Sequence, residues 1–283
     1  MHTPTEEPSL PTHVTRRRLF GAGLAAVGAA LVAREPTAQP PAAQTFLADA
    51  PPPLLLPPPH PAPSPSPAEP GTPTLNRPVF TLKEYRQVVP GPAFPDNAVA
   101  LTIDDGPHGG WTPQVLHILE KYHVQATFCM IGNQILGQEA VARSVVAAGH
   151  QVANHTWSHP ATLAQMPADK VEQEVYRAQE KIHETTGRTP TVFRSPGGAV
   201  SPAVFAAAAK AGMIPVNWDR DPKDWTKPGT QSITSHLLAA RPGDILLCHD
   251  GGGDRSQTCA ALRTVIPALQ SRGLQFVALG GQP

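Results

Sequence analysis

The sequence of 283 residues lacks any excess of charge, because 22 lysine and arginine residues are matched by 22 aspartate and glutamate residues. A protein that binds nucleic acid or an anionic membrane through its surface charge usually carries a basic excess. We therefore expect no nucleic-acid partner. An uncharged polymer such as a polysaccharide is compatible with this balance.

Cysteine is also scarce, with only Cys129, Cys248 and Cys259 in the chain. No arrangement of cysteine, histidine and acid in the sequence indicates a cysteine nucleophile. Cys129 lies inside an expected strand and is interpreted as a buried thiol. Cys248 and Cys259 flank a glycine-rich segment, and outside the cytoplasm they either form a disulfide or stay as two independent thiols.

The apolar run near the N-terminus is too short for a comfortable membrane span. Leu19–Ala33 is free of charge but has about 15 residues, which suits the hydrophobic part of an export signal. Arginines 16–18 precede it, and this pattern resembles a twin-arginine (Tat) signal, with an ordinary Sec signal as the alternative. We expect residues 1–33 to send a bacterial protein to the cell surface or the medium, and to anchor it in the membrane only if uncleaved.

Proline, in contrast, is abundant after this segment, with 16 prolines between residues 36 and 78. Such a segment holds neither a helix nor a central strand, because proline lacks the amide hydrogen that both need. Residues 34–78 are therefore interpreted as a semi-rigid linker with polyproline character. The folded domain is expected to span residues 79–283.

Strand and helix patterns alternate throughout this domain. Proline after a capping residue predicts helix starts at Thr112-Pro113 and Ser201-Pro202, and Pro267 is expected to kink the last helix. Repeated alternation predicts a mostly parallel sheet covered by helices. About seven such units favour an α/β fold of the distorted (β/α) barrel type, in which catalytic residues lie where strands end. The expected strands are residues 98–103, 125–131, 151–154, 191–193, 214–217, 245–248 and 276–279.

The most informative stretch is Ala98–Pro107, an apolar run that ends on Asp104 and Asp105 and is followed by a Gly-Pro turn. Neighbouring residues on a strand point to opposite faces. Two adjacent acids at a strand end can therefore serve different tasks, with one binding a cation and the other free to act as a base.

His155 and His159 follow the expected strand 151–154 and lie four residues apart. They can contact one cation if the segment between them makes a tight turn, and imidazole is a common ligand of zinc and related metals. With Asp105 they would form a set of three ligands, which leaves positions for water and substrate.

Three further polar motifs also come directly after expected strands. The first is Arg194–Gly198, in which the arginine can pair with a carboxylate and the glycines let the backbone approach a ligand. The second is Asp221–Trp225, which offers acids to orient a histidine and an aromatic ring to line a pocket. The third is Leu247–His249, which places a histidine where proton transfer would be expected.

Together these five motifs resemble those of the polysaccharide deacetylase family, also called the NodB-homology or carbohydrate esterase family 4 domain. The family order is T-F-D-D-G-P, H-S/T-x-x-H, R-x-P-x-G, D-x-x-D-W and L-x-H. In this chain the motifs read TIDDGP, HTWSH, RSPGG, DPKDW and LCH, in the same order, over residues 95–283. Gly197 departs from the family, which often has tyrosine there.

The resemblance implies a role for each matching residue. It implies that Asp104 is the general base, that Asp105, His155 and His159 are the metal ligands, and that His249 is the general acid. It also implies that Arg194 orients Asp104 and that Asp221 orients His249. The expected substrate contacts are Pro196, Gly197, Trp225 and Leu247.

The expected activity is hydrolysis of acetyl groups on an extracellular polysaccharide by a monomeric enzyme with a divalent metal, most simply zinc, with cobalt or nickel as alternatives. We favour the amide of an N-acetylated amino sugar in peptidoglycan or chitin oligomers. The alternatives are an O-acetyl esterase acting on acetylated xylan and a non-catalytic module that binds the cell wall.

Overall fold

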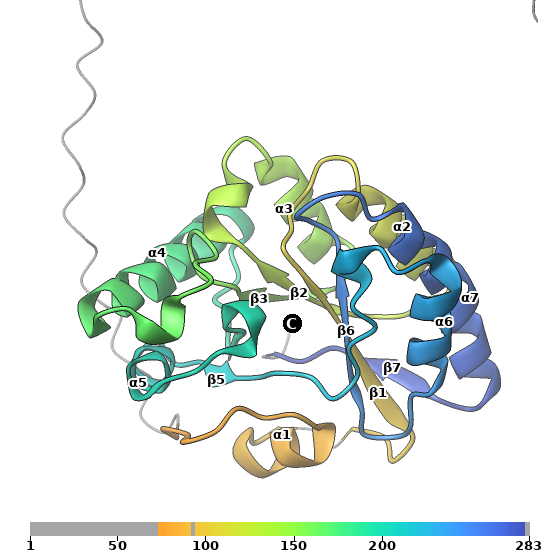
Figure 1. Cartoon of the computed structure of the whole chain (residues 1–283), viewed down its shortest axis with the longest axis horizontal. Coiled ribbons are helices and arrows are strands. Elements are labelled where there is room, and N and C mark those ends of the chain that lie inside the picture. Colours follow the sequence, from red (N-terminus) through yellow and green to blue (C-terminus); the bar gives the residue numbers. More distant parts are fainter. Residues whose placement is uncertain (1–72, 92–93, 281–283) are drawn as a thin grey trace, which may run out of the picture. The chain divides into compact units, whose positions relative to one another are not determined.

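The computed structural model describes residues 73–91 and 94–280 (Figure 1). The expected signal segment 1–33 and residues 34–72 of the expected linker lie outside the described residues. The strands are β1 (Ala98–Asp104), β2 (Thr127–Met130), β3 (Gln151–Asn154), β4 (Val192–Phe193), β5 (Ile214–Pro215), β6 (Ile245–His249) and β7 (Gln275–Val277). The α-helices are α1 (Leu82–Val88), α2 (Thr112–Lys121), α3 (Glu139–Ala147), α4 (Ala168–Thr186), α5 (Pro202–Lys210), α6 (Thr230–Leu238) and α7 (Ser256–Ser271).

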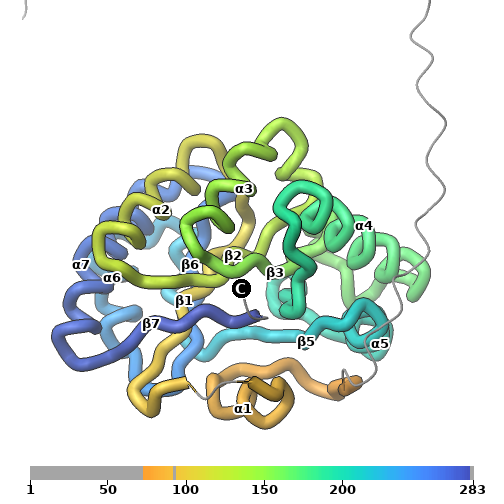
Figure 2. The backbone as a smooth tube through the Cα atoms, turned by 180° about the vertical axis from the view of Figure 1, so that it is seen from behind, coloured from red at the N-terminus to blue at the C-terminus, as the bar shows by residue number. Residues whose placement is uncertain are grey.

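All strand pairs in the seven-stranded sheet are parallel, in the order β5-β4-β3-β2-β1-β6, and β7 also pairs with β1. Parallel neighbours need crossover connections, and the helices that make them run around the outside of the strands (Figure 2). The carboxyl ends of the strands therefore lie at one rim, as in other (β/α) folds. The predicted α/β fold is confirmed.

The sheet curls until its two ends meet. Just after β5, Arg220 forms an isolated parallel bridge with Leu246 of β6, and the Leu247 amide donates to the Arg220 carbonyl at 2.9 Å. Beside β1, the chain beyond β7 continues to Leu279, whose amide donates to Thr127 Oγ at 2.7 Å. The strands thus close into the distorted barrel that the alternation predicts.

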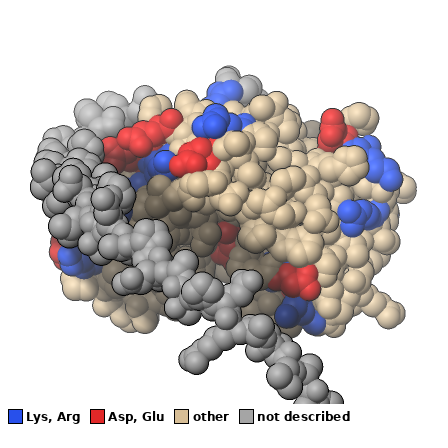
Figure 3. All heavy atoms as spheres, turned by 90° about the horizontal axis from the view of Figure 1, so that it is seen from above, with Lys and Arg blue, Asp and Glu red and all other residues tan. Residues whose placement is uncertain are grey.

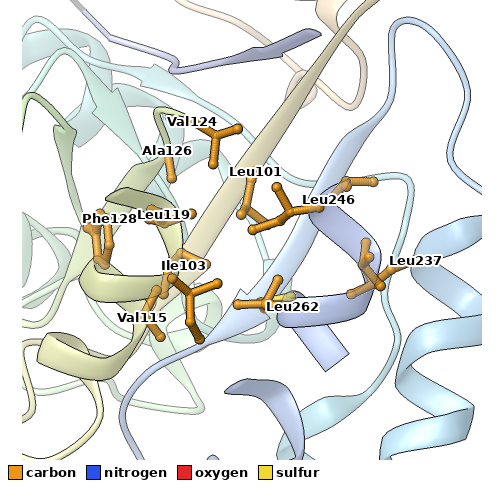
Figure 4. Packing of buried hydrophobic residues seen from close by; sticks show 14 of the residues in the cluster. Leu101, Ile103, Val115, Leu119, Val124, Ala126, Phe128, Leu237, Leu246 and Leu262 are labelled. Atoms are coloured by element: carbon orange, nitrogen blue, oxygen red, sulfur yellow. The ribbon is translucent and has the colours of Figure 1, made fainter. Parts of the chain in front are cut away.

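Alternation along β1 separates two packed regions. Leu101 and Ile103 point outward and pack with side chains of α2, α7 and β6 (Figure 4). Ala98 and Ala100 point inward and belong to a second cluster of small and branched residues inside the barrel. The same alternation makes Thr102 and Asp104 face the interior, and so the barrel itself holds one of the two acids.

Several local features differ from the sequence-based expectations. Helix α1 was not expected, and the Thr81 side chain caps it by accepting from the Glu84 amide. Helix α2 begins at Thr112 itself rather than after it. Helix α7 includes Pro267, where the expected kink stays a prediction, and the Arg263 carbonyl, four residues earlier, accepts from the Tyr122 hydroxyl at 3.0 Å.

Among residues 73–91 and 94–280, the helices are all too short or too polar to cross a bilayer.

Candidate active site

The inner acid, Asp104, is held by an arginine inside the barrel. Arg194 follows β4 and is fully buried, and its Nη1 donates to Asp104 Oδ1 at 3.0 Å. The guanidinium also donates to Thr102 Oγ at 2.7 Å and to the carbonyls of Val216 and Asn217 at 3.0 Å. Burial alone would lower the pKa of Arg194, but the Asp104 charge raises it above its ordinary value. Arg194 is therefore a fixed cation beside Asp104.

The outer acid, Asp105, lies beside the two histidines. Its Oδ1 is 3.5 Å from His155 Nε2 and 3.4 Å from His159 Nε2, and the potential ligand atoms of the three residues all lie within 4.8 Å of one another. The structure thus brings together the three residues that the sequence groups as a ligand set.

This set fits a divalent cation. Asp105 Oδ1 is buried and has no hydrogen-bond partner among the described residues. A buried carboxylate oxygen without a partner is costly unless a cation supplies the missing interaction. Burial alone would raise the pKa of Asp105, but the nearby His155 side chain lowers it. An ionised carboxylate with two imidazoles suits zinc and related metals.

The His155 ring is oriented by the strand beside it. Its Nδ1 lies 2.8 Å from the Arg194 carbonyl, an acceptor, so Nδ1 carries the hydrogen and Nε2 keeps a free lone pair. Nε2 is the atom that faces Asp105. Arg194, the residue after β4, therefore contacts both parts of the site. Its side chain binds Asp104, and its carbonyl binds His155 of the ligand set.

The backbone around the set is unusual for residues with side chains. Asp105, Thr156 and His159 all have left-handed φ angles, of 76°, 68° and 56°. Such conformations cost energy for residues other than glycine and persist only where neighbouring contacts hold them. They concentrate here at the residues that turn the ligand atoms toward one another.

Asp224, rather than Asp221, contacts the histidine at the end of β6. His249 Nδ1 lies 2.6 Å from Asp224 Oδ1, and the His249 amide donates to Asp224 Oδ2 at 2.9 Å. Thr258 Oγ also donates to Asp224 Oδ2 at 2.8 Å. Burial alone would lower the pKa of His249, but the Asp224 carboxylate raises it above its ordinary value.

The predicted role of Asp221 is therefore wrong. Its carboxylate accepts from the Lys223 amide at 2.7 Å and lies 3.6 Å from Lys223 Nζ. Lys223 has a left-handed φ of 53°, and the turn that it makes carries Asp224 into the interior. The motif holds two acids, and their spacing alone does not say which one enters the site.

The expected substrate contacts lie in different environments. Pro196 is buried, Gly197 is exposed with a left-handed φ of 59°, and a side chain at Gly197 would meet open space. Leu247 is 2% exposed on β6, whereas Trp225 is 52% exposed beside Asp224. Only Trp225 and Gly197 of this group therefore offer substantial accessible surface.

Asp250, next to His249, is a buried acid that the motifs do not single out. Its Oδ2 accepts from Thr112 Oγ at 2.5 Å, and its Oδ1 has no partner among the described residues. A Cβ at Gly106 would lie 2.4 Å from this Oδ1, so glycine is needed there. Burial raises the pKa of Asp250 to about 7.

The three cysteines are buried free thiols. Burial raises the pKa of each, so none is activated as a nucleophile. The alternative of independent thiols at Cys248 and Cys259 is the one that the structure contains.

Comparison with known proteins identifies relatives of this chain. Residues 91–216 match the polysaccharide deacetylase family. A peptidoglycan-N-acetylglucosamine deacetylase from Bacillus cereus is 40% identical over 187 residues, which cover 65% of this chain and 87% of the relative. A chitooligosaccharide deacetylase from a Bradyrhizobium species is 43% identical over 192 residues, covering 63% of this chain and 87% of the relative.

The fold is matched as well. The crystal structure of the Bc1960 peptidoglycan N-acetylglucosamine deacetylase superposes with a TM-score of 0.64 at 30% sequence identity. The match covers 71% of this chain and 90% of that chain. The resemblance found in the sequence motifs is therefore confirmed over both sequence and structure.

Proposed function

Because this chain belongs to the polysaccharide deacetylase family, we propose that it is a metal-dependent hydrolase that removes the acetyl group from N-acetylated amino sugars of an extracellular polysaccharide. The observation that carries the proposal is that three groups lie together at one rim of the barrel. They are the ligand set, the acid bound by a buried arginine, and the histidine bound by a buried acid. In a metal-dependent amide hydrolase these three groups would hold the cation, accept a proton from water and donate a proton to the leaving nitrogen.

Asp105, His155 and His159 would hold the cation, for which we expect zinc, with cobalt or nickel as substitutes. When bound, such a cation acts as a Lewis acid, lowering the pKa of water and stabilising negative charge on a carbonyl oxygen. The His155 tautomer fixed by the Arg194 carbonyl leaves the correct nitrogen free for this role.

Asp104 is the general base of the proposed reaction. It would accept the proton of the attacking water, and Arg194 Nη1, which donates to Oδ1, holds the carboxylate in place. The second oxygen, Oδ2, lies 3.8 Å from His155 Nε2, beside the ligand set. A base at this position would lie next to the water that the cation is proposed to activate.

His249 is the general acid. The nitrogen of an amide is a poor leaving group, so it must gain a proton as the bond to carbon breaks. Asp224 accepts from Nδ1, which leaves Nε2–H to donate to that nitrogen. The raised pKa of His249 favours the protonated ring that this step requires.

The acetyl group would lie between Leu247 and Trp225, with the backbone near Pro196 and Gly197 facing the developing oxyanion. The open space at Gly197, where the family often has tyrosine, leaves this side of the site without an aromatic contact to the sugar. We therefore expect a looser preference for sugar than for the acetyl group.

The named relatives favour peptidoglycan or chitin oligomers as substrate, and acetylated xylan is the alternative for an O-acetyl esterase. In Figure 3, the part of the face that the described residues form is hollowed near its middle and carries both signs of charge, without a broad patch of either among those residues. Such a surface suits an uncharged polymer better than a polyanion. We also propose that the protein works outside the cell as a monomer after Tat export.

Acetate release from peptidoglycan, chitin oligomers and acetylated xylan, measured side by side, tests the proposal. We expect release from the two amino-sugar polymers, loss after dialysis against a strong chelator, and recovery with zinc or cobalt. Full activity of a verified metal-free sample would contradict a metal-dependent reaction. Binding to these polymers without any acetate release would favour the non-catalytic module.

The two adjacent acids give the sharpest test of the assigned roles. Asp105→Asn should weaken metal binding, because a charged ligand becomes neutral. Asp104→Asn should keep about one metal per chain but lose about 10²–10⁴-fold in rate, the usual contribution of a general base. Metal content by elemental analysis, read beside acetate release, separates the two variants. Metal loss in Asp104→Asn alone would reverse the assignment.

A further inference from the structure

We propose that Glu174 on α4 is a positioning residue that holds the His159 end of the ligand segment His155–His159. The proposal rests on the proposed metal site and concerns how that site is kept in shape. Glu174 comes from an element outside all five sequence motifs, 15 residues beyond His159 in the sequence.

Glu174 makes two hydrogen bonds to the residue next to His159. The Ser158 amide donates to Glu174 Oε2 and the Ser158 hydroxyl donates to Glu174 Oε1, each at 2.8 Å. Both carboxylate oxygens are thus used on one loop residue. Bonds to an ionised acceptor are stronger than bonds between neutral groups, so this pairing is a firm link between α4 and the loop.

The loop needs such a link because its backbone is unfavourable. Thr156 and His159 both have left-handed φ angles, and Ser158 lies between them. Within the segment, the His159 amide donates to Thr156 Oγ at 3.0 Å, which closes the turn on itself. Contacts with the rest of the protein must then keep the turn in place.

The two ends of the segment are held in different ways. At the His155 end, the buried Asn154 side chain donates to the Val175 carbonyl of α4 at 2.8 Å and accepts from the Thr156 amide at 2.9 Å. His155 itself is buried and bonded to the Arg194 carbonyl. The His159 side chain is 36% exposed, so packing constrains it much less.

A second contact with α4 reinforces this interpretation. One turn after Glu174, the Arg177 guanidinium lies 3.7 Å from the ring centre of Trp157. The face of α4 that carries Glu174 and Arg177 therefore contacts two consecutive residues of the loop. Loss of Glu174 should free the His159 end while the His155 end stays in place.

The experiment measures Co²⁺ affinity of the full chain by visible absorption, starting from metal-free protein. We expect Glu174→Ala to bind Co²⁺ about tenfold more weakly, the lower range for groups that support metal ligands. Its spectrum should also change, because the histidine supplied by the loop is less well placed. Glu174→Gln keeps one carbonyl acceptor and should fall between Glu174→Ala and the wild type.

Glu172 provides a matched control on the same helix. It pairs with Lys210 at 3.0 Å on the surface and contacts no part of the ligand segment in the described structure. Glu172→Ala should leave both the affinity and the spectrum unchanged. Ser158→Ala, which removes only the hydroxyl bond, should weaken binding less than Glu174→Ala and add little to it in the double variant.

The outcomes separate this inference from the function on which it rests. If the wild type binds no Co²⁺, the proposed metal site is contradicted, and so is the role of Glu174 that depends on it. If the wild type binds and Glu174→Ala binds equally well with the same spectrum, only the role of Glu174 is overturned. Equal weakening in Glu174→Ala and Glu172→Ala would overturn it too, since a general loss of helix stability would explain both.

Discussion

The site contains two pairs of a carboxylate with a cationic side chain, and they are built in opposite ways. In the pair of Arg194 and Asp104, the proposed reacting group is the carboxylate, and the support is a guanidinium that stays charged at any working pH. In the pair of His249 and Asp224, the proposed reacting group is the imidazole, and the support is the carboxylate. In each pair the supporting side chain carries the charge opposite to that of its partner: the guanidinium favours the carboxylate, and the carboxylate favours the imidazolium.

The two pairs also differ in burial. Both members of the Arg194 pair lie inside the barrel, with side chains 0% and 3% exposed, whereas the His249 side chain is 11% exposed above a fully buried Asp224. The cation of the deeper pair is a guanidinium, which keeps its charge at any working pH, whereas the imidazole of the other pair gains and loses a proton and lies nearer to solvent.

Removing the inner support should have the largest effect. Arg194→Met leaves Asp104 as a buried charge without a partner. We therefore expect the rate to fall at least 10²-fold, within the range of about 10²–10⁴-fold that loss of a general base usually causes. We also expect a loss of about 3–5 kcal/mol in the free energy of unfolding. Denaturant unfolding and acetate release would be measured together. Arg194→Lys, which keeps the charge but not the fork of donors, should fall in between.

Wild-type stability and rate in Arg194→Met would remove the proposed dependence of the inner pair on its cation. Loss of stability without loss of rate would leave Arg194 as a structural residue only.

Removing the charge of the outer support should act mainly on the pH profile. Asp224→Asn keeps an acceptor for His249 Nδ1–H but loses the charge that raises the pKa of His249. The histidine then loses its proton at lower pH, so the alkaline limb of kcat/KM should move to lower pH. The rate at the optimum should fall by less than the roughly 10²–10⁴-fold expected for loss of the acid itself.

Asp221→Asn is the matched control for this prediction, because Asp221 belongs to the same motif but contacts Lys223. Its profile should overlay that of the wild type. A shifted alkaline limb in Asp221→Asn with an unchanged one in Asp224→Asn would reverse our assignment.

The smallest effect is expected at Asp250, whose carboxyl group is buried and accepts a hydrogen bond from Thr112. Its pKa is raised by burial from 3.8 to about 7, so the folded state binds the proton more tightly than the unfolded state. The stability that this proton contributes is present below about pH 4 and is lost as pH rises through 7. Asp250→Asn should therefore gain stability relative to the wild type as pH increases over this range.

Thermal unfolding of the metal-free proteins between pH 4 and 8 measures this difference. A constant gap between the two proteins at every pH would show that the carboxyl group does not titrate in this range.

Much of the site follows from the sequence because parallel strands bring their carboxyl ends together. The alternation of strands and helices predicts a parallel barrel, in which all strands end at one rim. The motifs that follow a strand must therefore meet there, and these are the strands 98–103, 151–154, 191–193 and 245–248. The strict alternation of side chains on β1 likewise predicts different surroundings for Asp104 and Asp105, and the structure shows them.

Other features depend on contacts that no local pattern contains. Asp224 reaches His249 through a turn with a left-handed lysine, and lysine gives no signal for such a turn. Asp250 is buried because Gly106 lets the chain approach it, which links positions 144 residues apart. Glu174 lies on a helix whose sequence reads as an ordinary amphipathic surface element.

The place of β1 in the sheet also has a consequence for how the domain is made. This strand ends at Asp104 and leads directly into Asp105, yet two of its three partners, β6 and β7, come from the last part of the chain. During synthesis, β1 must therefore wait for almost the whole domain to emerge before its pairing is complete, and contacts between such distant residues slow folding. The acids reach their final positions only when the chain is nearly complete, so an enzyme cut short at its C-terminus would have every motif up to the cut and no assembled site.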